Sequence, residues 1–145
     1  MSKKVLIVED EIFVALEIEQ IVEDAGFAVS AIAADRESAL VAAADCDIAL
    51  VDLNLRDGPT GPSIGMELAA TYGVRVIYVT ANPAQIGAAS QAALGVITKP
   101  FRPQSIAATL HLAASNQNDL ETAEISGFTP FPPPPGSWSG MGSTG

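Results

Sequence analysis

The chain has 145 residues, 48% hydrophobic and 17% charged, which is the balance of one globular domain rather than of a disordered chain. Seventeen acidic residues against seven basic ones give a net charge of −10, which argues against nucleic acid as a direct ligand and suits a cation or a basic partner surface. A single cysteine, Cys46, excludes an internal disulfide and a multi-cysteine zinc site. The first apolar run, Val5 to Val8, is too short for a signal peptide or a membrane span, so we expect a cytoplasmic protein with no membrane partner.

Short apolar runs alternate with helical patterns over residues 1–115. The runs predict buried strands at 5–8, 27–32, 47–53, 74–79 and 95–98. Apolar residues at helical spacing, bounded by caps and stops, predict helices at 11–25, 35–44, 63–72, 83–93 and 103–114. Asp35 and Ser63 are the expected N-caps, and Gly26 and Gly73 the expected helix stops.

Strands that alternate with helices predict βαβ units and therefore a parallel sheet. Because the strands are apolar throughout, helices are expected on both faces of the sheet. The expected fold class is therefore α/β, with a doubly wound, five-stranded parallel sheet. In such sheets ligands bind outside the carboxyl ends of the strands.

Residues 116–145 differ from the rest of the chain and are assigned to a Pro/Gly-rich C-terminal tail that follows a domain at 1–115. The tail shows no helical or strand period, and its proline run favours polyproline II. It carries four large apolar residues: Ile125, Phe128, Phe131 and Trp138. We hypothesise that these residues pack the tail across this domain, or across a neighbouring copy of it, near the face formed by the last two helices and the last strand.

Polar residues follow four of the predicted strands. Glu9 and Asp10 follow the first, Asp52 lies near the end of the third, Thr80 ends the fourth and Lys99 follows the fifth. Taken alone, Glu9 and Asp10 also fit a solvated helix N-terminus. If the first and third strands are neighbours, three carboxylates converge, and each close pair repels by roughly 4 kcal/mol at an effective dielectric of about 20. A Mg²⁺ ion, which prefers hard oxygen ligands, would offset this repulsion, and Lys99 supplies a further positive charge.

Four segments together resemble the receiver domain of two-component response regulators. They are Val5-Leu-Ile-Val-Glu-Asp-Glu11, Leu50-Val-Asp-Leu-Asn54, Val79-Thr80-Ala81 and Thr98-Lys99-Pro100-Phe101, and the resemblance covers residues 3 to about 115. It implies a flavodoxin-like sheet with strand order 2-1-3-4-5 and a cis Lys99–Pro100 peptide bond.

The resemblance also implies roles for individual residues. Asp52 would accept the phosphoryl group, Lys99 would pair with it, and Thr80 would donate a hydrogen bond to one of its oxygens. Asp10, Asp52 and the backbone carbonyl of Asn54 would hold Mg²⁺, with Glu9 acting through water. Such a protein is a signalling acceptor and not a turnover enzyme.

The implied donor is a phosphohistidine on a sensor histidine kinase. The long loop at 54–62, with Gly-Pro twice, resembles receivers of alphaproteobacterial general-stress and light-response systems, whose kinases belong to the HWE and related classes. We expect a stand-alone regulator that docks on a protein or acts as a phosphate sink; the downstream target and homodimer formation stay open. Val96 departs from the family, because many receivers carry Tyr or Phe at this position.

Two other functions remain as alternatives. A haloacid-dehalogenase-like phosphohydrolase also uses a strand-end aspartate, but it needs a second aspartate where this chain has Asn54. An unphosphorylated pseudo-receiver would act only as a binding module. The chain lacks the glycine patterns of a Rossmann enzyme or a P-loop.

Overall fold

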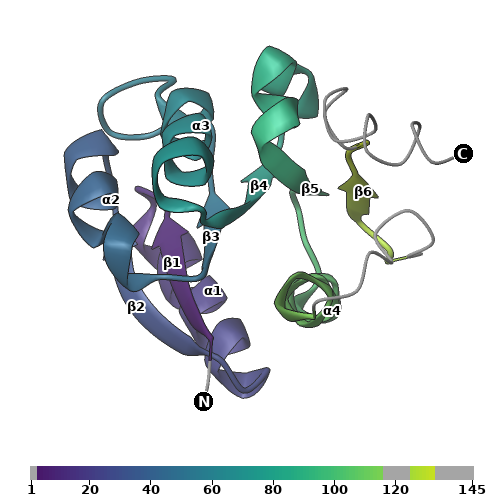
Figure 1. Ribbon diagram of the computed structural model, residues 1–145. Helices are drawn as coiled ribbons and strands as arrows, with labels where there is room; N and C mark the ends of the chain where they lie inside the picture. Colours follow the sequence, from purple (N-terminus) through teal and green to yellow (C-terminus); the bar gives the residue numbers. More distant parts are fainter. Residues whose placement is uncertain (1–2, 116–124, 133–145) are drawn as a thin grey trace, which may run out of the picture.

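The five predicted apolar runs form adjacent parallel strands of one sheet in the computed structural model, which describes residues 3–115 and 125–132 (Figure 1). In chain order the elements are β1 Lys4–Val8, α1 Ile12–Asp24, β2 Ala28–Ala33, α2 Arg36–Ala42, η1 Ala43–Asp45, β3 Ile48–Val51, α3 Gly61–Tyr72, β4 Arg75–Thr80, η2 Pro83–Ala92, β5 Ala93–Thr98, α4 Pro103–Ala114 and β6 Phe128–Pro130, where η marks 3₁₀ structure. The strand order is β2-β1-β3-β4-β5-β6, so the predicted order 2-1-3-4-5 is confirmed.

Apolar layers cover both faces of the sheet, as the continuous hydrophobic strands predicted. On one face α2, α3 and η2 contribute buried residues such as Ala39, Leu68 and Ile86. On the other face α1 and α4 contribute Ile18 and Leu110 among others. The central strands β1, β3 and β4 are therefore shielded from water on both sides, and their carboxyl ends are left as the place where polar groups gather.

Helix boundaries follow local capping chemistry. Asp35 is the N-cap of α2, and its side chain forms a reciprocal capping box with Ser38, as expected. The predicted N-cap at Ser63 is wrong, because α3 begins two residues earlier, at Gly61, with Thr60 at the cap position. Pro62 in the first turn explains the difference, since proline lacks the N–H that this turn leaves unpaired.

Residues 83–93 do not form the predicted α-helix. Pro83–Ala92 adopts 3₁₀ turns that are interrupted at Gly87, where φ is 56° and ψ is −134°. Only Ile86 and Ala89 of this segment are buried, so little apolar packing is available to stabilise a regular helix. Ala93 belongs to β5 instead.

A sixth strand corrects the expectation of a five-stranded, entirely parallel sheet. β6, within the segment for which no strand was predicted, pairs antiparallel with β5 at the end of the sheet opposite β2 (Figure 1). Ile125, Phe128 and Phe131 of the tail do pack on the domain formed by residues 3–115. Trp138 lies outside the described residues. In the described part of the chain, every helix is too short or too polar to cross a bilayer.

Candidate functional site

Three carboxylates meet where β1 and β3 end. These strands are neighbours, and Val8 pairs with Val51, so Glu9 and Asp52 follow at the same edge of the sheet. Their backbone N–H groups continue the ladder, with Glu9 donating to Ala33 and Asp52 donating to Val8. One carboxylate oxygen each from Glu9, Asp10 and Asp52 lies within 4.8 Å of the others. The convergence expected from the sequence is therefore present.

Lys99 reaches this acidic cluster from β5, two strands away from β3. Its Nζ donates to Glu9 Oε1 at 2.9 Å and to Asp52 Oδ2 at 3.3 Å. The peptide bond to Pro100 is cis, as the resemblance implied. The Lys99 backbone N–H donates to the Thr80 carbonyl at 2.9 Å, which ties the lysine to the end of β4. One cation therefore bridges two acids that are far apart in the sequence.

Burial and charge act against each other at this bridge. The Glu9 side chain is only 2% exposed, and burial, reinforced by the Asp52 charge and opposed by Lys99, raises the pKa of Glu9 to about 7. Burial tends to lower the pKa of Lys99, but its bond to Glu9 and the charges of Glu9 and Asp52 outweigh this and raise it. Lys99 therefore stays charged, and its positive charge compensates the cost of burying the Glu9 carboxylate.

Asp52 combines partial exposure with an orientation fixed by hydrogen bonds. Its side chain is 12% exposed, so it can be reached from outside, whereas that of Glu9 is closed off. Asp52 Oδ1 accepts a hydrogen bond from the Leu53 N–H at 2.7 Å, and Oδ2 faces Lys99. These contacts fix the orientation of the carboxylate, which favours attack on an approaching electrophile.

Thr80 and Asn54 lie beside the cluster in different ways. Thr80 ends β4, is buried, and its Oγ1 accepts a hydrogen bond from the Asn82 N–H at 3.0 Å. The hydroxyl hydrogen is therefore free to be donated elsewhere. Asn54 is exposed, and its side-chain amide pairs reciprocally with that of Gln85, at 2.9 and 3.2 Å. Sequence reasoning missed Gln85, because nothing in the pattern of 83–93 indicated which residue would face the loop after β3.

The donor set fits a magnesium ion. Glu9, Asp10 and Asp52 offer only hard oxygen ligands, and Asp10 is exposed, which leaves room for bound water. Three carboxylates next to a single lysine leave an excess of negative charge for a divalent cation to balance.

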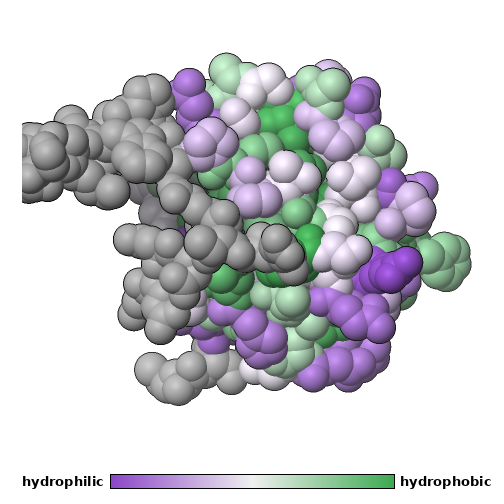
Figure 2. All heavy atoms as spheres, turned by 90° about the vertical axis from the view of Figure 1, so that its right-hand side faces the viewer, coloured by the Kyte–Doolittle hydropathy of each residue, from purple (hydrophilic) through white to green (hydrophobic). Residues whose placement is uncertain are grey.

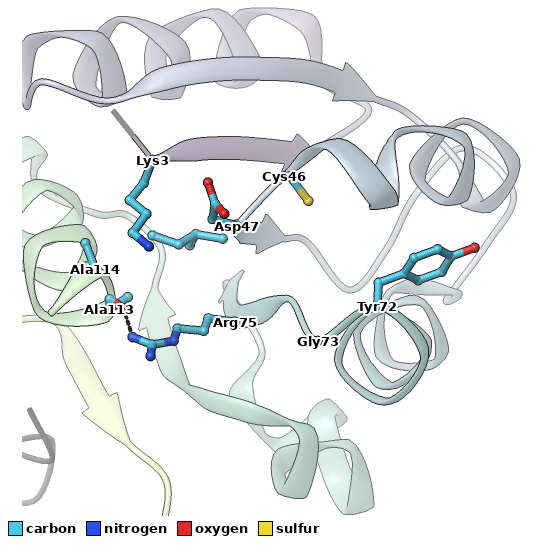
Figure 3. Close-up of a pocket in the computed structure, with 9 residues that line it drawn as sticks. Lys3, Cys46, Asp47, Tyr72, Gly73, Arg75, Ala113 and Ala114 are labelled. Carbon is cyan, nitrogen blue, oxygen red and sulfur yellow. Dashed lines mark hydrogen bonds between the residues drawn. The ribbon is translucent and has the colours of Figure 1, made fainter. Parts of the chain in front are cut away.

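A hollow lies at the opposite end of the strands from the acidic cluster (Figure 3). It measures about 230 Å³ and lies beside the amino ends of β3 and β4, near Asp47 and Arg75. The Arg75 guanidinium donates to the Ala113 and Ser115 carbonyls at the end of α4, and Asp47 accepts from the Lys4 N–H. Arg75 and Asp47 are therefore already hydrogen-bonded within the fold, where they join α4 and β1 to the amino ends of β4 and β3.

The fold and the acidic cluster together define the class of flavodoxin-like α/β proteins that carry their site at the carboxyl ends of parallel strands. Within that class, the model of the response regulator receiver domain family matches residues 5–111. The chain belongs to this family, and so to the proteins of two-component signalling.

Several of the proteins that the chain is similar to are PhyR regulators. The chain is 32% identical over 129 residues to the phyllosphere-induced regulator PhyR of Methylorubrum extorquens, a match that covers 86% of this chain and 48% of the relative. The chain thus spans about half the length of that curated relative. Among solved structures, the receiver domain of Erythrobacter litoralis PhyR is 30% identical with a TM-score of 0.73, covering 81% of this chain and 93% of that one. PhyR of Brucella abortus is also 30% identical, with a TM-score of 0.68 over 78% of this chain and 48% of its own.

Proposed function

We propose that the chain accepts a phosphoryl group on Asp52 from the phosphohistidine of a sensor histidine kinase. The observation that carries this proposal is the arrangement around Asp52, a reachable carboxylate at the end of β3 with Lys99 Nζ 3.3 Å away and two further acids beside it. In the described part of the chain, Glu9 and Asp52 are the two carboxylates that share a lysine, and Asp52 is the more exposed of the two, at 12% against 2%.

The transfer is a substitution at phosphorus. An Asp52 oxygen attacks, an O–P bond forms, and the P–N bond to the donor imidazole breaks; the imidazole nitrogen leaves with the electron pair and takes up a proton. Lys99 holds the attacking carboxylate and then faces the new phosphoryl oxygens. Thr80 has a free hydroxyl hydrogen for one of these oxygens.

Asp10 and Asp52 would hold Mg²⁺, joined by the backbone carbonyl of Asn54, with Glu9 acting through water. When bound, the ion supplies charge neutralisation on the phosphoryl oxygens. The chain's own contribution is positioning, since the three carboxylates are already gathered by β1 and β3 and by the hydrogen bonds described above.

The two alternatives are less well supported. A haloacid-dehalogenase-like hydrolase needs an acid where Asn54 stands, and the Asn54 amide, paired with Gln85, cannot transfer protons. A pseudo-receiver would have lost some of the reactive set, whereas Glu9, Asp10, Asp52, Thr80 and Lys99 are all in place here.

The relatives suggest where the signal goes. One solved relative, from Bartonella quintana, is described as the anti-anti-sigma factor PhyR. This relative supports the proposal that the chain acts in a PhyR-like pathway. The long loop at 54–62 is the feature that supports an HWE-type kinase as the donor. Two modes of action are compatible with a PhyR-like pathway: docking on a protein target and service as a phosphate sink. Both also suit a stand-alone regulator.

The test is incubation with a small phosphodonor such as acetyl phosphate, followed by intact-mass measurement. We expect a gain of one phosphoryl group with Mg²⁺, none after chelation, and none in Asp52→Asn. Asp45→Asn, an exposed acid bound only to Lys4, is the matched control and should react like the wild type. Phosphorylation of Asp52→Asn at the wild-type level would show that the acceptor lies elsewhere.

A further inference from the structure

The tail segment Ile125–Phe131 covers the free edge of β5, which would otherwise end the sheet (Figure 1). Ile97, Val96 and Gly95 of β5 pair with Phe128, Thr129 and Pro130, respectively. Hydrogen bonds flank this register on both sides, from the Thr98 N–H to the Gly127 carbonyl at 3.0 Å and from the Phe131 N–H to the Leu94 carbonyl at 2.9 Å. An uncovered edge strand is a template for pairing with another extended chain, and here the protein supplies that chain itself.

The register suits the sequence of the segment. In an antiparallel ladder, hydrogen-bonded and non-bonded pairs alternate. Since Thr98 with Gly127 and Leu94 with Phe131 are bonded positions, Gly95 and Pro130 form a non-bonded pair. The N–H that Pro130 lacks is therefore not needed by β5.

Side chains hold the segment from both faces of the sheet. Phe128 is buried among the residues between the sheet, α1 and α4, and Phe131 packs on the opposite face. The Phe128 ring lies over Gly95, where an added Cβ would come within 2.6 Å of the ring atom Cζ. Gly95 thus forms a notch in β5 that receives an aromatic ring.

A second contact fixes the start of the segment. The Ser105 hydroxyl on α4 donates to the Ser126 carbonyl, and Ser105 is itself buried. Gly127, with φ of 83°, then turns the chain onto β5. Figure 2 faces this side of the molecule and shows hydrophobic residues, in green, that reach the surface between polar ones.

The segment is held less firmly than the other strands. β6 has three residues and contacts one neighbour, whereas β1, β3 and β4 each have two neighbouring strands. Thr129 is exposed, and Pro130 and Phe131 are only partly buried. Edge elements with few buried contacts open at a lower free-energy cost than the global unfolding of the domain.

We propose that the β5 edge is a strand-acceptor site for an extended, aromatic-bearing peptide, and that Ile125–Phe131 is its tethered, displaceable ligand. The backbone of β5 supplies the hydrogen bonds that pair with the peptide. The Gly95 notch receives one aromatic side chain, and the apolar surface on the other face of the sheet receives a second one, three residues further along the peptide. The proposal does not depend on phosphoryl transfer.

The test uses the full chain and a fluorescently labelled synthetic peptide that copies residues 125–132. Phe128→Ala removes the main anchor of the tethered segment, so amide exchange at Thr98 and Phe131 should speed up at least tenfold. The labelled peptide should then bind this variant in a fluorescence anisotropy titration, and bind the wild type at least tenfold more weakly, because the site is already filled. Thr129→Ala, an exposed position in the same strand, should behave like the wild type.

Two further arms locate the binding site. A peptide in which the phenylalanine at position 128 is alanine should not bind. Gly95→Val, or the milder Gly95→Ala, combined with Phe128→Ala should abolish binding of the labelled peptide while the Asp52 amide, which donates to Val8 inside the sheet, stays protected. The proposal is overturned if exchange at Thr98 is unchanged in Phe128→Ala, if the peptide fails to bind that opened variant, or if it binds equally well when Gly95 is filled.

Discussion

Lys99 shows how much one residue contributes to this site. Its ammonium group compensates the charge of the buried Glu9 carboxylate and orients the partly exposed Asp52 carboxylate. Its backbone N–H joins the end of β5 to the end of β4. The sequence indicated its importance through its place after a strand. Its two partners became known only once the chain had folded, because they precede it by 90 and 47 residues.

Removal of this lysine should strengthen metal binding. In Lys99→Ala the three carboxylates lose a competing positive charge, so Mg²⁺ affinity should rise on the order of tenfold. Isothermal titration with MgCl₂ measures this, and Lys4→Ala, an exposed lysine that contacts Asp45, is the control. Unchanged or weaker affinity in Lys99→Ala would argue against a metal held by Glu9, Asp10 and Asp52.

Cys46 offers a test of local electrostatics far from the acidic cluster. Burial, assisted by the charges of Asp47 and Asp45, raises the pKa of the Cys46 thiol to about 11. Because only the thiolate reacts, alkylation by iodoacetamide at pH 8 should be about 100-fold slower in the folded chain than in urea, and should accelerate as the pH rises towards 11. Equal rates at pH 8 with and without urea would contradict the predicted shift.

Among the elements, α3 and β4 show how close packing restricts sequence. Tyr78 is buried, its hydroxyl donates to the Pro62 carbonyl at 3.2 Å, and burial raises the pKa of this phenol. A Cβ added at Gly65 would lie 2.7 Å from the Tyr78 ring atom Cζ. Position 65 therefore has no room for a side chain, although the helical pattern alone would favour alanine there.

Gly65→Ala should destabilise the domain by roughly 1–3 kcal/mol through overpacking. Urea unfolding measures this loss, and Thr71→Ala, exposed on the same helix, should have little effect. Adding Tyr78→Val to Gly65→Ala removes the colliding ring, so the double variant should lose less stability than the two single losses combined. If the stability losses of the two single variants simply add in the double variant, the side chains at positions 65 and 78 do not collide.

At the scale of the whole molecule, the sheet connects the acidic cluster to the β5 edge. Thr98 donates its N–H to Gly127 in the tail, and the next residue, Lys99, donates its ammonium group to Asp52. Thr98 also pairs with Thr80 across β4 and β5. Two consecutive residues, Thr98 at the end of β5 and Lys99 directly after it, thus connect Asp52 to the tail.

Phosphorylation should loosen the tail. New phosphoryl oxygens on Asp52 would draw Lys99 and the end of β5 towards β3, so exchange of the Thr98 amide should speed up several-fold in the presence of Mg²⁺ and excess phosphodonor. The Ala28 amide, which donates to Lys3 at the other edge of the molecule, is the internal control, and Asp52→Asn should show no response. If the Thr98 amide exchanges at the same rate with and without phosphorylation, the acidic cluster and the β5 edge are not coupled.

The α/β class, the parallel sheet and the acidic cluster could all be predicted from the sequence, because these depend on strand-long apolar runs and on residues placed directly after them. Glu9, Asp10, Asp52, Thr80 and Lys99 were all identifiable in this way, although their chemical roles stay predictions. Tertiary structure decided what local pattern could not: the 3₁₀ turns at Pro83–Ala92, the Gln85 contact with Asn54, and β6. The Gln85 contact and β6 each depend on a partner distant in the sequence, whereas the 3₁₀ turns reflect how few residues of their segment are buried. For β6 the partner is an edge strand whose glycine leaves room for an aromatic ring.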